Sequence, residues 1–504
     1  MFSKTFIHEF LLKTVPHIER ILGIRIEMAR SLYNAILKEA LIRASLMKQS
    51  KLWTKAKNEK SQERKKLFQE ARNFYQFSDY SLQKFAISVK NSCDIGKHLD
   101  THTCQKIATR AFNAVDQYVK GIKGKPRFKR KGWLSSLEGK SNEAGIRFRG
   151  KNLCWKGLEI PIVFNKKDPD LVELHALNSK IKYCRLIQKT IKEKTCYFVQ
   201  LILEGTPFIK PKNTTKNEII GLDLGPSSIA VFSKEEASLQ AFCPELDPLF
   251  KEIRLLQRTM DRSQRAMNPE NYENGKIKKD RLEWKKSKRY QKCKKIIAEI
   301  FRKTAVFRKR LHGKLVNEIL KHGNHIKIEK LSYRGWQKMY GKSVGKKAPS
   351  LFVNILRRKV ENTGGSFEEV STQKTHLSQT CHQCGKREKK PLSKRWHKCC
   401  DVVAQRDLYS AFLVFHVKDN ILDISQAKID WPSAHPLLEQ AMSRLNQTTT
   451  GKARLASFGF AQNKTYECSP SQSCSLAKDR SDINKAKDGV GSFPRALESL
   501  CSCC

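Results

Sequence analysis

The sequence predicts a multidomain α/β protein, and three features of its 504 residues indicate this class. Residues 16–120 carry apolar side chains at intervals of three and four, which is typical of amphipathic helices. Residues 121–216 contain short runs of β-branched and aromatic residues between turn signals, which predicts strands. From residue 217 onward strand-like and helix-like segments alternate, which predicts a further α/β domain.

The charge balance indicates a polyanionic partner. Lys and Arg number 98 against 49 Asp and Glu, so the formal net charge is +49. Nucleic acid is the partner that most commonly offers enough phosphate to match such a charge. A membrane is the weaker alternative, because no segment reaches the roughly 20 apolar residues that span a bilayer and the N-terminal segment has no signal-peptide pattern. We therefore expect a cytoplasmic protein that acts on nucleic acid.

The N-terminal half changes character after the helical block. A basic loop rich in Gly and Pro begins near residue 121. The strands that follow predict a small barrel that ends by residue 216. Within the helical block, residues 51–85 mix lysines with aromatic rings, which suits a nucleic-acid backbone and its exposed bases. A helical pair with its rings turned inward is the alternative.

The C-terminal half begins with I-I-G-L-D-L-G-P-S-S-I-A-V-F-S, which predicts two strands joined by a tight turn. A long helical stretch at 246–323 carries cations on most faces, so we expect it to lie along nucleic acid rather than to be buried. The run H-I-K-I-E-K-L predicts a strand that ends at Glu329. A helix at 351–361 and a strand at 367–371 should follow.

Three carboxylates stand at the ends of predicted elements. Asp223 and Glu329 each end a strand, and Asp407 opens an apolar helix, where an acidic residue is favourable. Phosphodiester hydrolysis needs an activated water and neutralised charge, which two Mg²⁺ ions about 3.5–4 Å apart supply when carboxylates hold them. The order strand-Asp, strand-Glu, helix-Asp predicts an RNase H-like nuclease core. Its three acids should meet at the strand ends of one sheet, with Asp223 bridging the ions.

Each acid taken alone has an ordinary alternative. The pattern G-x-D-x-G also opens actin-like ATPases and sugar kinases, where the Asp contacts a magnesium nucleotide. A Glu can end any strand, and an Asp can cap any helix. The order of the three acids, with a cysteine cluster directly before the third, favours the nuclease.

That cysteine cluster predicts a zinc site. Cys381-x-x-Cys384 followed by Gly is a good half-site for tetrahedral zinc, which needs two more N or S ligands. The second half reads H-K-C-C, so Cys400 is the predicted third ligand, and Cys399 or His397 is the fourth. Cysteines that bind no metal are the alternative. In a long basic chain without a signal segment, the 16 cysteines are expected to be reduced or metal-bound rather than disulfide-bonded.

The chain resembles the TnpB family of transposon-encoded RNA-guided DNA endonucleases, which are related to the compact type V CRISPR effectors. The matching motifs are G-K-P-R-F-K at 124–129, G-L-D-L-G at 221–225, I-E-K-L at 328–331, S-Q-T-C-H-Q-C-G at 378–385 and R-D-L-Y-S-A at 406–411. The resemblance is specific over about 217–415, looser over 1–216, and does not cover the tail. It departs from the family at the contracted second half of the zinc motif, where Asp401 replaces the usual Gly.

The resemblance implies a guide RNA, a double-stranded target DNA with a short adjacent motif, and cleavage of both strands at one RuvC-like site in a prokaryotic cytoplasm. It matches the three acids to catalytic residues, and Cys381, Cys384 and Cys400 to zinc ligands. Two alternatives stay open: a guide-independent RuvC or RNase H-type nuclease, and an RNA-guided DNA-binding protein that has lost cleavage.

The resemblance also implies the domain organisation. A β-barrel wedge domain, interrupted by a helical recognition domain, precedes a RuvC nuclease domain that carries a zinc-ribbon insertion. The boundaries we predict are 1–15 for the first wedge strand, 16–120 for the helical recognition domain, 121–216 for the wedge barrel, 217–374 for the nuclease part with its basic helical insertion, 375–403 for the zinc-binding insertion, 404–420 for the final nuclease helix, and 421–504 for a polar, partly disordered tail.

Overall fold

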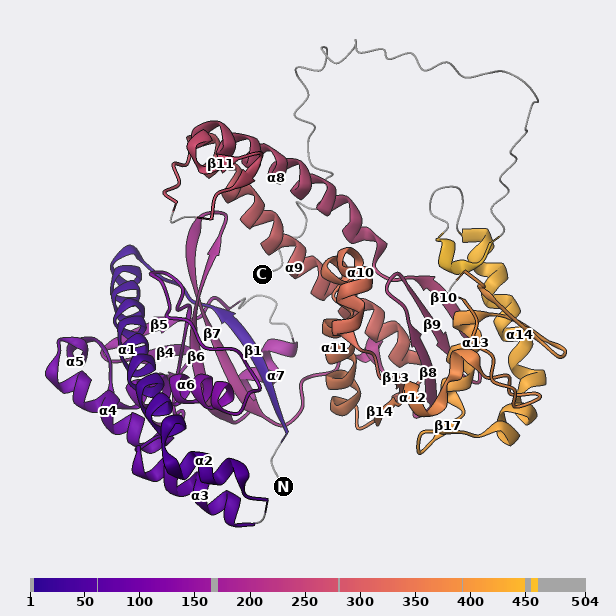
Figure 1. Ribbon diagram of the computed structural model, residues 1–504, viewed down its shortest axis with the longest axis horizontal. Helices are drawn as coiled ribbons and strands as arrows, with labels where there is room; N and C mark the ends of the chain where they lie inside the picture. The colour runs from indigo at the N-terminus through magenta and orange to yellow at the C-terminus, as the bar shows by residue number, and fades with distance from the viewer. Residues whose placement is uncertain are drawn as a thin grey trace, which may run out of the picture. The chain divides into compact units, whose positions relative to one another are not determined.

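The computed structural model describes residues 4–60, 62–164, 171–279, 282–391, 393–448 and 455–460 (Figure 1). Of the predicted polar tail, residues 449–454 and 461–504 therefore lie outside the described residues. Among the described residues, no helix has both the length and the apolar character needed to cross a membrane.

Helices make up the chain between residues 16 and 119. Pro16 lies in the first turn of the long helix α1, where its missing N–H costs nothing. Side chains of Ser50, Ser78 and Asp100 accept N–H bonds at the starts of three later helices and so fix where those helices begin. The helices are α1 (Pro16–Gln49), α2 (Lys51–Asn58), α3 (Gln62–Phe74), α4 (Asp79–Ser92), α5 (Ile95–His98) and α6 (Thr101–Val119).

Two antiparallel sheets share a hydrophobic core with these helices. The N-terminal strand β1 pairs with β7, almost 200 residues later, so the start of the chain belongs to the same core. A bridge between Leu12 and Ile162 joins the two sheets, and this pair of sheets stands where we predicted a small barrel. The first sheet has the order β1 (Thr5–Leu11), β7 (Lys194–Glu204), β6 (Ile181–Ile191), β2 (Ser136–Glu138); the second has β3 (Arg147–Arg149), β4 (Asn152–Trp155), β5 (Leu158–Pro161), and α7 (Leu171–Asn178) precedes β6.

A five-stranded sheet forms the centre of the C-terminal half (Figure 1). Three antiparallel strands follow one another in the chain, and two later strands add in parallel beside the first. This places the ends of β8 and β13 at the same edge of the sheet. The order is β10 (Ala237–Ala241), β9 (Ser228–Phe232), β8 (Ile219–Leu224), β13 (His325–Glu329), β14 (Phe367–Val370).

The two faces of β8 meet different helices, as the alternation of side chains in a strand requires. Ile220, Leu222 and Leu224 share a hydrophobic core with side chains of α9 and α11. Gly221 lies on the opposite face, against α13. The helices of this half are α8 (Asp247–Met267), α9 (Lys288–His322), α10 (Tyr333–Lys347), α11 (Pro349–Asn362), α12 (Thr372–Thr375), α13 (Arg406–Phe415) and α14 (Ile424–Thr448).

The basic stretch at 246–323 differs from its prediction in two ways. It is a pair of helices, α8 and α9, because Pro269 follows the end of α8 and cannot continue a helix. The second half of α9 is not laid out in solvent, since Leu315, Val316 and Ile319 are buried in the sheet core. The apolar stripe is present in the sequence, but the surrounding lysines and arginines obscure it.

Helix α14 occupies part of the segment that we predicted to be a polar tail. Pro432 and Pro436 lie inside it, and proline in a helix interior normally argues against a helix. Burial of Leu438 and Leu445, and the ion pair of Arg444 with Glu236 beside β10, stabilise the helix in spite of these prolines.

The short strands of the C-terminal half are β11 (Tyr272–Glu273), β12 (Lys276–Ile277), β15 (Trp396–Cys399), β16 (Val402–Gln405), β17 (Val417–Lys418) and β18 (Ile421–Leu422).

Candidate active site and cysteine cluster

Asp223 and Glu329 reach the same edge of the five-stranded sheet. Parallel pairing sets Ile328 opposite Leu222, so the next residue on each strand is one of the two acids. Carboxyl ends of neighbouring parallel strands are a common place for ligand sites, because side chains from several elements converge there. The register therefore brings together two acids that are 106 positions apart in the sequence.

Asp407 arrives from α13, which lies directly against β8. A Cβ built on Gly221 would lie 2.1 Å from the Ala411 carbonyl oxygen, so only glycine allows this approach. At the other end of the helix, the Lys327 ammonium donates to the carbonyl oxygens of Phe415 (3.1 Å) and Val417 (2.5 Å). Cations and donors at a helix C-terminus satisfy its last carbonyls.

The N-terminus of α13 is fixed by a buried side chain. The Gln405 Oε1 atom accepts the Leu408 N–H at 2.9 Å, as an N-cap residue does. The Ser228 hydroxyl, from the start of β9, donates to Asp407 Oδ2 at 3.1 Å. Asp407 is therefore held both by its helix and by the neighbouring strand.

One pocket with a volume of about 620 Å³ contains all three acids. Two arginines and two aromatic rings line it together with small polar side chains. A segment that follows α14 in the chain also lines it, which no pattern in its residues predicted. Besides the acids, the lining includes Ser228, Trp336, Tyr340, Ser343, Arg395, Arg406, Ser410, Leu455, Ala456 and Ser457.

Crowding and burial raise the pKa of every acid in the pocket. The Asp223 pKa lies well above its usual range, first because of burial and then because Asp407 and Glu329 are close. Burial raises the pKa of Glu329 to about 7, although Arg406 opposes the shift. Burial also raises the pKa of Asp407, while the Ser228 hydroxyl and Arg395 lower it. Together the carboxylates form an oxygen-rich site with more negative charge than its arginines neutralise.

The pKa of Glu329 predicts how stability depends on pH. Its folded value of about 7 lies above the ordinary 4.5, so between these values the folded state binds more protons than the unfolded state. Without divalent cations the Tm should therefore fall as the pH rises from about 5 to about 7. Glu329→Gln should make this fall smaller, which thermal melts at several pH values would measure.

Glu235→Gln is the matched control, because Glu235 is exposed and Lys216 holds its pKa below the usual range. It should leave the fall in Tm between about pH 5 and pH 7 unchanged. If the Tm of wild type and of Glu329→Gln depended on pH in the same way, the raised pKa of the Glu329 carboxyl would be wrong.

Four cysteines converge beside this site. The sulfur atoms of Cys381, Cys384, Cys399 and Cys400 all lie within 4.8 Å of one another and could hold a metal ion. The backbone of Lys386 holds the pKa of the Cys384 thiol at about 7. Hydrogen bonding, first from Cys384, raises the pKa of Cys399 to about 12. The four thiols lie close enough to hydrogen-bond to one another, and a soft cation that binds all four would displace their protons.

His397 does not join the cysteines. It is buried, its Nδ1 atom lies 2.9 Å from the Lys390 ammonium, and its ring centroid lies 4.2 Å from that of Tyr409. Of the two possible fourth ligands, the sulfur cluster contains Cys399.

The cysteine cluster is tied to α13 through a buried hydroxyl. The backbone N–H of His382 donates to the Tyr409 hydroxyl at 3.0 Å, and the His382 Nδ1 atom lies 2.7 Å from the same oxygen. Tyr409 follows Asp407 by two positions on α13, and Trp431 of α14 packs edge-on to its ring. The segment that carries the four cysteines is therefore in direct contact with α13, the helix that carries Asp407.

Sequence reasoning did not identify the side chains that hold or neutralise the acids. Ser228 lies in P-S-S-I, where nothing distinguishes it from an ordinary turn residue. Arg395 precedes the hairpin of β15 and β16, and Gln405 ends it. Only the fold of this hairpin brings Arg395 to the pocket and Gln405 to the start of α13. Arg406 is adjacent to Asp407 in R-D-L-Y-S-A, so its position in the sequence was the one available signal.

Comparison with known proteins matches one segment of the C-terminal half to a family model. Residues 350–414 match the family model described as the TNB domain of Cas12f1-like proteins. The fold is similar to that of the protein in a Cas12f1–sgRNA–target DNA complex. That match covers 82% of this chain and 98% of the other chain, at 14% identity and a TM-score of 0.42. A match to the protein of a CRISPR–Cas12f ternary complex covers 79% of this chain and 82% of the other chain, at 13% identity and a TM-score of 0.27. No curated protein gave a match. By its motifs and its TNB-type segment, the chain is similar to the compact type V CRISPR effectors and TnpB-like proteins.

Proposed function

We propose that this chain is an RNA-guided DNA endonuclease that hydrolyses phosphodiester bonds at one Mg²⁺-dependent site. The observation that carries the proposal is the meeting of Asp223, Glu329 and Asp407, from three separate elements, in one pocket. The match of residues 350–414 to a Cas12f1-like domain supports a nuclease function of this kind.

The donor set fits Mg²⁺. Carboxylate oxygens are the ligands that this hard cation prefers. Burial raises the pKa values of the three acids, and a bound cation would stabilise their charged forms. Asp223, which both other acids influence, would be shared by two ions, and Glu329 and Asp407 would each hold one. When bound, Mg²⁺ neutralises phosphate charge and lowers the pKa of a coordinated water.

Other residues of the pocket would prepare the substrate. Arg395 and Arg406 supply positive charge beside the acids, which favours entry of a phosphate. Trp336 and Tyr340 of α10 add half-buried rings on which unpaired bases could stack. Ser228 keeps Asp407 in one orientation, so the acid needs little rearrangement during the reaction.

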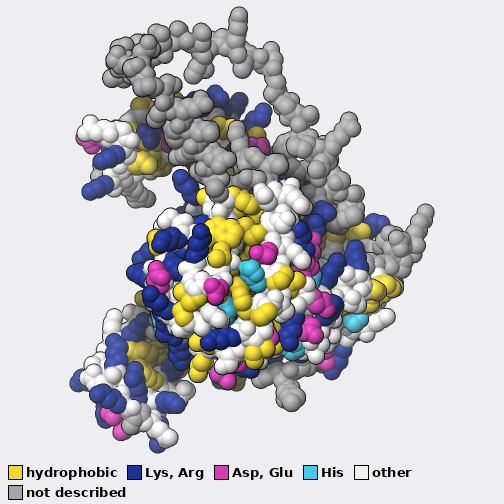
Figure 2. Space-filling model, turned by 90° about the vertical axis from the view of Figure 1, so that its right-hand side faces the viewer, with side chains coloured by type: hydrophobic (Ala, Val, Ile, Leu, Met, Phe, Trp, Pro, Cys, Tyr) yellow, Lys and Arg dark blue, Asp and Glu magenta, His cyan; other side chains and the backbone are white. Residues whose placement is uncertain are grey.

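Guide RNA and double-stranded DNA with a short adjacent motif are the proposed partners. The net charge of +49 suits a protein that must hold a guide, a heteroduplex and a displaced strand by their backbones. Lys and Arg side chains spread widely over the face shown in Figure 2. Exposed cations also follow α8 and α9, namely Lys251, Arg254, Arg258, Arg262, Lys292, Lys294, Lys309 and Arg310.

We further propose that the four cysteines hold one structural zinc ion. Cys399→Ser should remove the zinc from the purified protein, measured by elemental analysis, whereas His397→Gln should retain it. Because the cluster contacts α13 through Tyr409, loss of zinc should also lower the cleavage rate by about tenfold or more. Cys93→Ser, at an exposed cysteine outside the cluster, is the control. Zinc retained in Cys399→Ser and lost in His397→Gln would reverse the ligand assignment.

Sequencing of the RNA that co-purifies with the protein tests the proposed guide. We expect one RNA species with a common scaffold and a variable segment. A heterogeneous RNA population without a shared scaffold would favour the guide-independent nuclease instead.

A further inference from the structure

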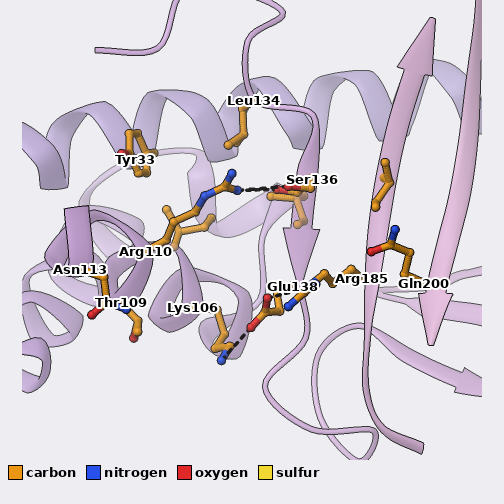
Figure 3. A pocket seen from close by; sticks show the side chains of 13 residues that line it. Tyr33, Lys106, Thr109, Arg110, Asn113, Leu134, Ser136, Glu138, Arg185 and Gln200 are labelled. Atoms are coloured by element: carbon orange, nitrogen blue, oxygen red, sulfur yellow. Dashed lines mark hydrogen bonds and ion pairs between the residues drawn. The ribbon is translucent and has the colours of Figure 1, made fainter. Parts of the chain in front are cut away.

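A second pocket lies in the N-terminal part of the chain, and it shares no lining residue with the carboxylate pocket. Its volume of about 510 Å³ falls in the range of small-ligand sites. Side chains of α1, α6, β2, β6 and β7 surround it, and all these elements belong to one hydrophobic core. Figure 3 shows Arg110, Tyr33 and Asn113 on one side of it and the strands on the other.

One cation of this pocket is not neutralised by an acid. Lys106 and Arg185 both pair with Glu138, at 3.0 Å and 2.7 Å (Figure 3). The Arg110 guanidinium instead donates to the Ser136 carbonyl at 3.1 Å and hydroxyl at 3.3 Å, and it contacts no carboxylate among the described residues. These neutral contacts fix its orientation and leave its charge unpaired.

Lys129 adds a second unpaired cation at the rim. Its ammonium lies 5.3 Å from the centre of the Tyr33 ring, which lines the pocket, and no carboxylate of the described part of the chain pairs with it. Burial lowers the pKa of Lys129, and the nearby Arg110 lowers it further. Arg110 and Tyr33 line the same pocket and Lys129 lies beside that ring, so these two cations, neither paired with an acid, could together hold an anion.

The backbone at Lys129 is held rigidly. The Asn34 amide donates to the Lys129 carbonyl and accepts its N–H, both at 2.9 Å, and Arg30 donates to the same carbonyl. The loop 121–133 that contains it has six Lys or Arg and no acid. On this anchored loop Phe128 is 53% exposed and Trp133 is 67% exposed. Large exposed rings among cations are typical of surfaces that stack nucleic-acid bases.

We propose that this pocket binds one unpaired nucleotide of a nucleic-acid strand. Arg110 and Lys129 would hold its phosphate, and the base would enter the cavity toward the Asn113 amide. Neighbouring bases of the same strand would stack on Phe128 and Trp133. A duplex fits poorly, because its bases are already stacked and none projects into a cavity. The inference rests on the proposed nucleic-acid function but concerns a separate site.

Binding of fluorescein-labelled 12-nucleotide single strands, without Mg²⁺, tests this pocket. Arg110→Gln should weaken binding by about tenfold, as expected for a charge-assisted hydrogen bond to the phosphate of the bound nucleotide. It should also reduce the slope of log K against log salt by about 0.7, the value for one single-strand phosphate. Lys131→Gln makes the same charge change on an exposed side chain of the loop and should cost less than about threefold.

A base analogue reports the enclosed nucleotide directly. A strand that contains 2-aminopurine should become brighter on binding to wild type and to Lys131→Gln, but not to Arg110→Gln. Equal effects of the two substitutions, or a larger effect of Arg110→Gln on a 12-base-pair duplex, would overturn the proposal. Parallel DNA and RNA strands assign the nucleotide to target or guide. Should Arg110→Gln lower the Tm, Lys129→Gln replaces it, since Asn34 bonds only to the backbone there.

These measurements do not depend on cleavage. A protein that fails to cut DNA but shows the predicted single-strand effects would remove the proposed endonuclease and leave this pocket assigned. If the protein cuts DNA but Arg110→Gln and Lys131→Gln have equal effects, the endonuclease proposal stands and the assignment of this pocket is wrong.

Discussion

Asp223→Ala is expected to lower the rate of DNA cleavage by at least about 10³-fold. Asp407 and Glu329 both help to raise the pKa of Asp223, so Asp223 is the carboxylate that the proposed ions would share. Without Asp223, Glu329 and Asp407 should no longer be able to hold the two ions together in one site. Single-turnover cleavage of an end-labelled target duplex, at saturating Mg²⁺, measures the effect.

Binding should separate a catalytic role from a structural one. Affinity for RNA and DNA is expected to stay within about threefold in Asp223→Ala, because the cations that hold the backbones are elsewhere. Asp401→Ala, at an exposed acid of the cysteine hairpin, is the control and should cut normally. Undiminished cutting by Asp223→Ala would show that the active site lies outside this pocket.

Gly221→Ala should destabilise the protein by about 3 kcal/mol, with a fall in Tm of about 6 °C or more. The added methyl group would lie 2.1 Å from the Ala411 carbonyl oxygen and 2.7 Å from the Phe415 nitrogen, both backbone atoms that a rotamer change cannot move. Helix α13 would have to leave β8, and Asp407 would leave the pocket with it. Thermal unfolding monitored by circular dichroism measures the loss.

Gly313→Ala provides the matched control. Gly313 lies within α9, and an added Cβ would meet no atom within 4 Å. Because alanine favours helix over glycine by about 0.8–1 kcal/mol, this variant should be slightly more stable than wild type. If both glycine variants melted like wild type, the close contact between β8 and α13 would be wrong.

The three acids could be predicted because local signals mark them. Runs of β-branched residues predict strands, and Asp223 and Glu329 each stand at the end of such a run. Asp407 opens an apolar helix whose periodicity is equally local. The structure brings all three into one pocket, which is the arrangement their order along the chain predicted.

What could not be predicted depends on partners far apart in the sequence. The bond between Ser228 and Asp407 joins residues separated by 179 positions, and neither local sequence suggests it. Helix α14 was missed because two prolines lower its local propensity, whereas its stability comes from tertiary burial of Leu438 and Leu445. The choice between Cys399 and His397 likewise depended on how the β15–β16 hairpin turns, which spacing alone does not fix.

Cleavage of a duplex library that matches the co-purified RNA tests the central claim most directly. The library carries a matched segment beside randomised flanks, and cut ends are sequenced with and without Mg²⁺. The account predicts Mg²⁺-dependent cuts in both strands, only in matched molecules with a common short flanking motif, and none with Asp223→Ala. Cuts that ignore the match to the RNA, or that persist in Asp223→Ala, would contradict it.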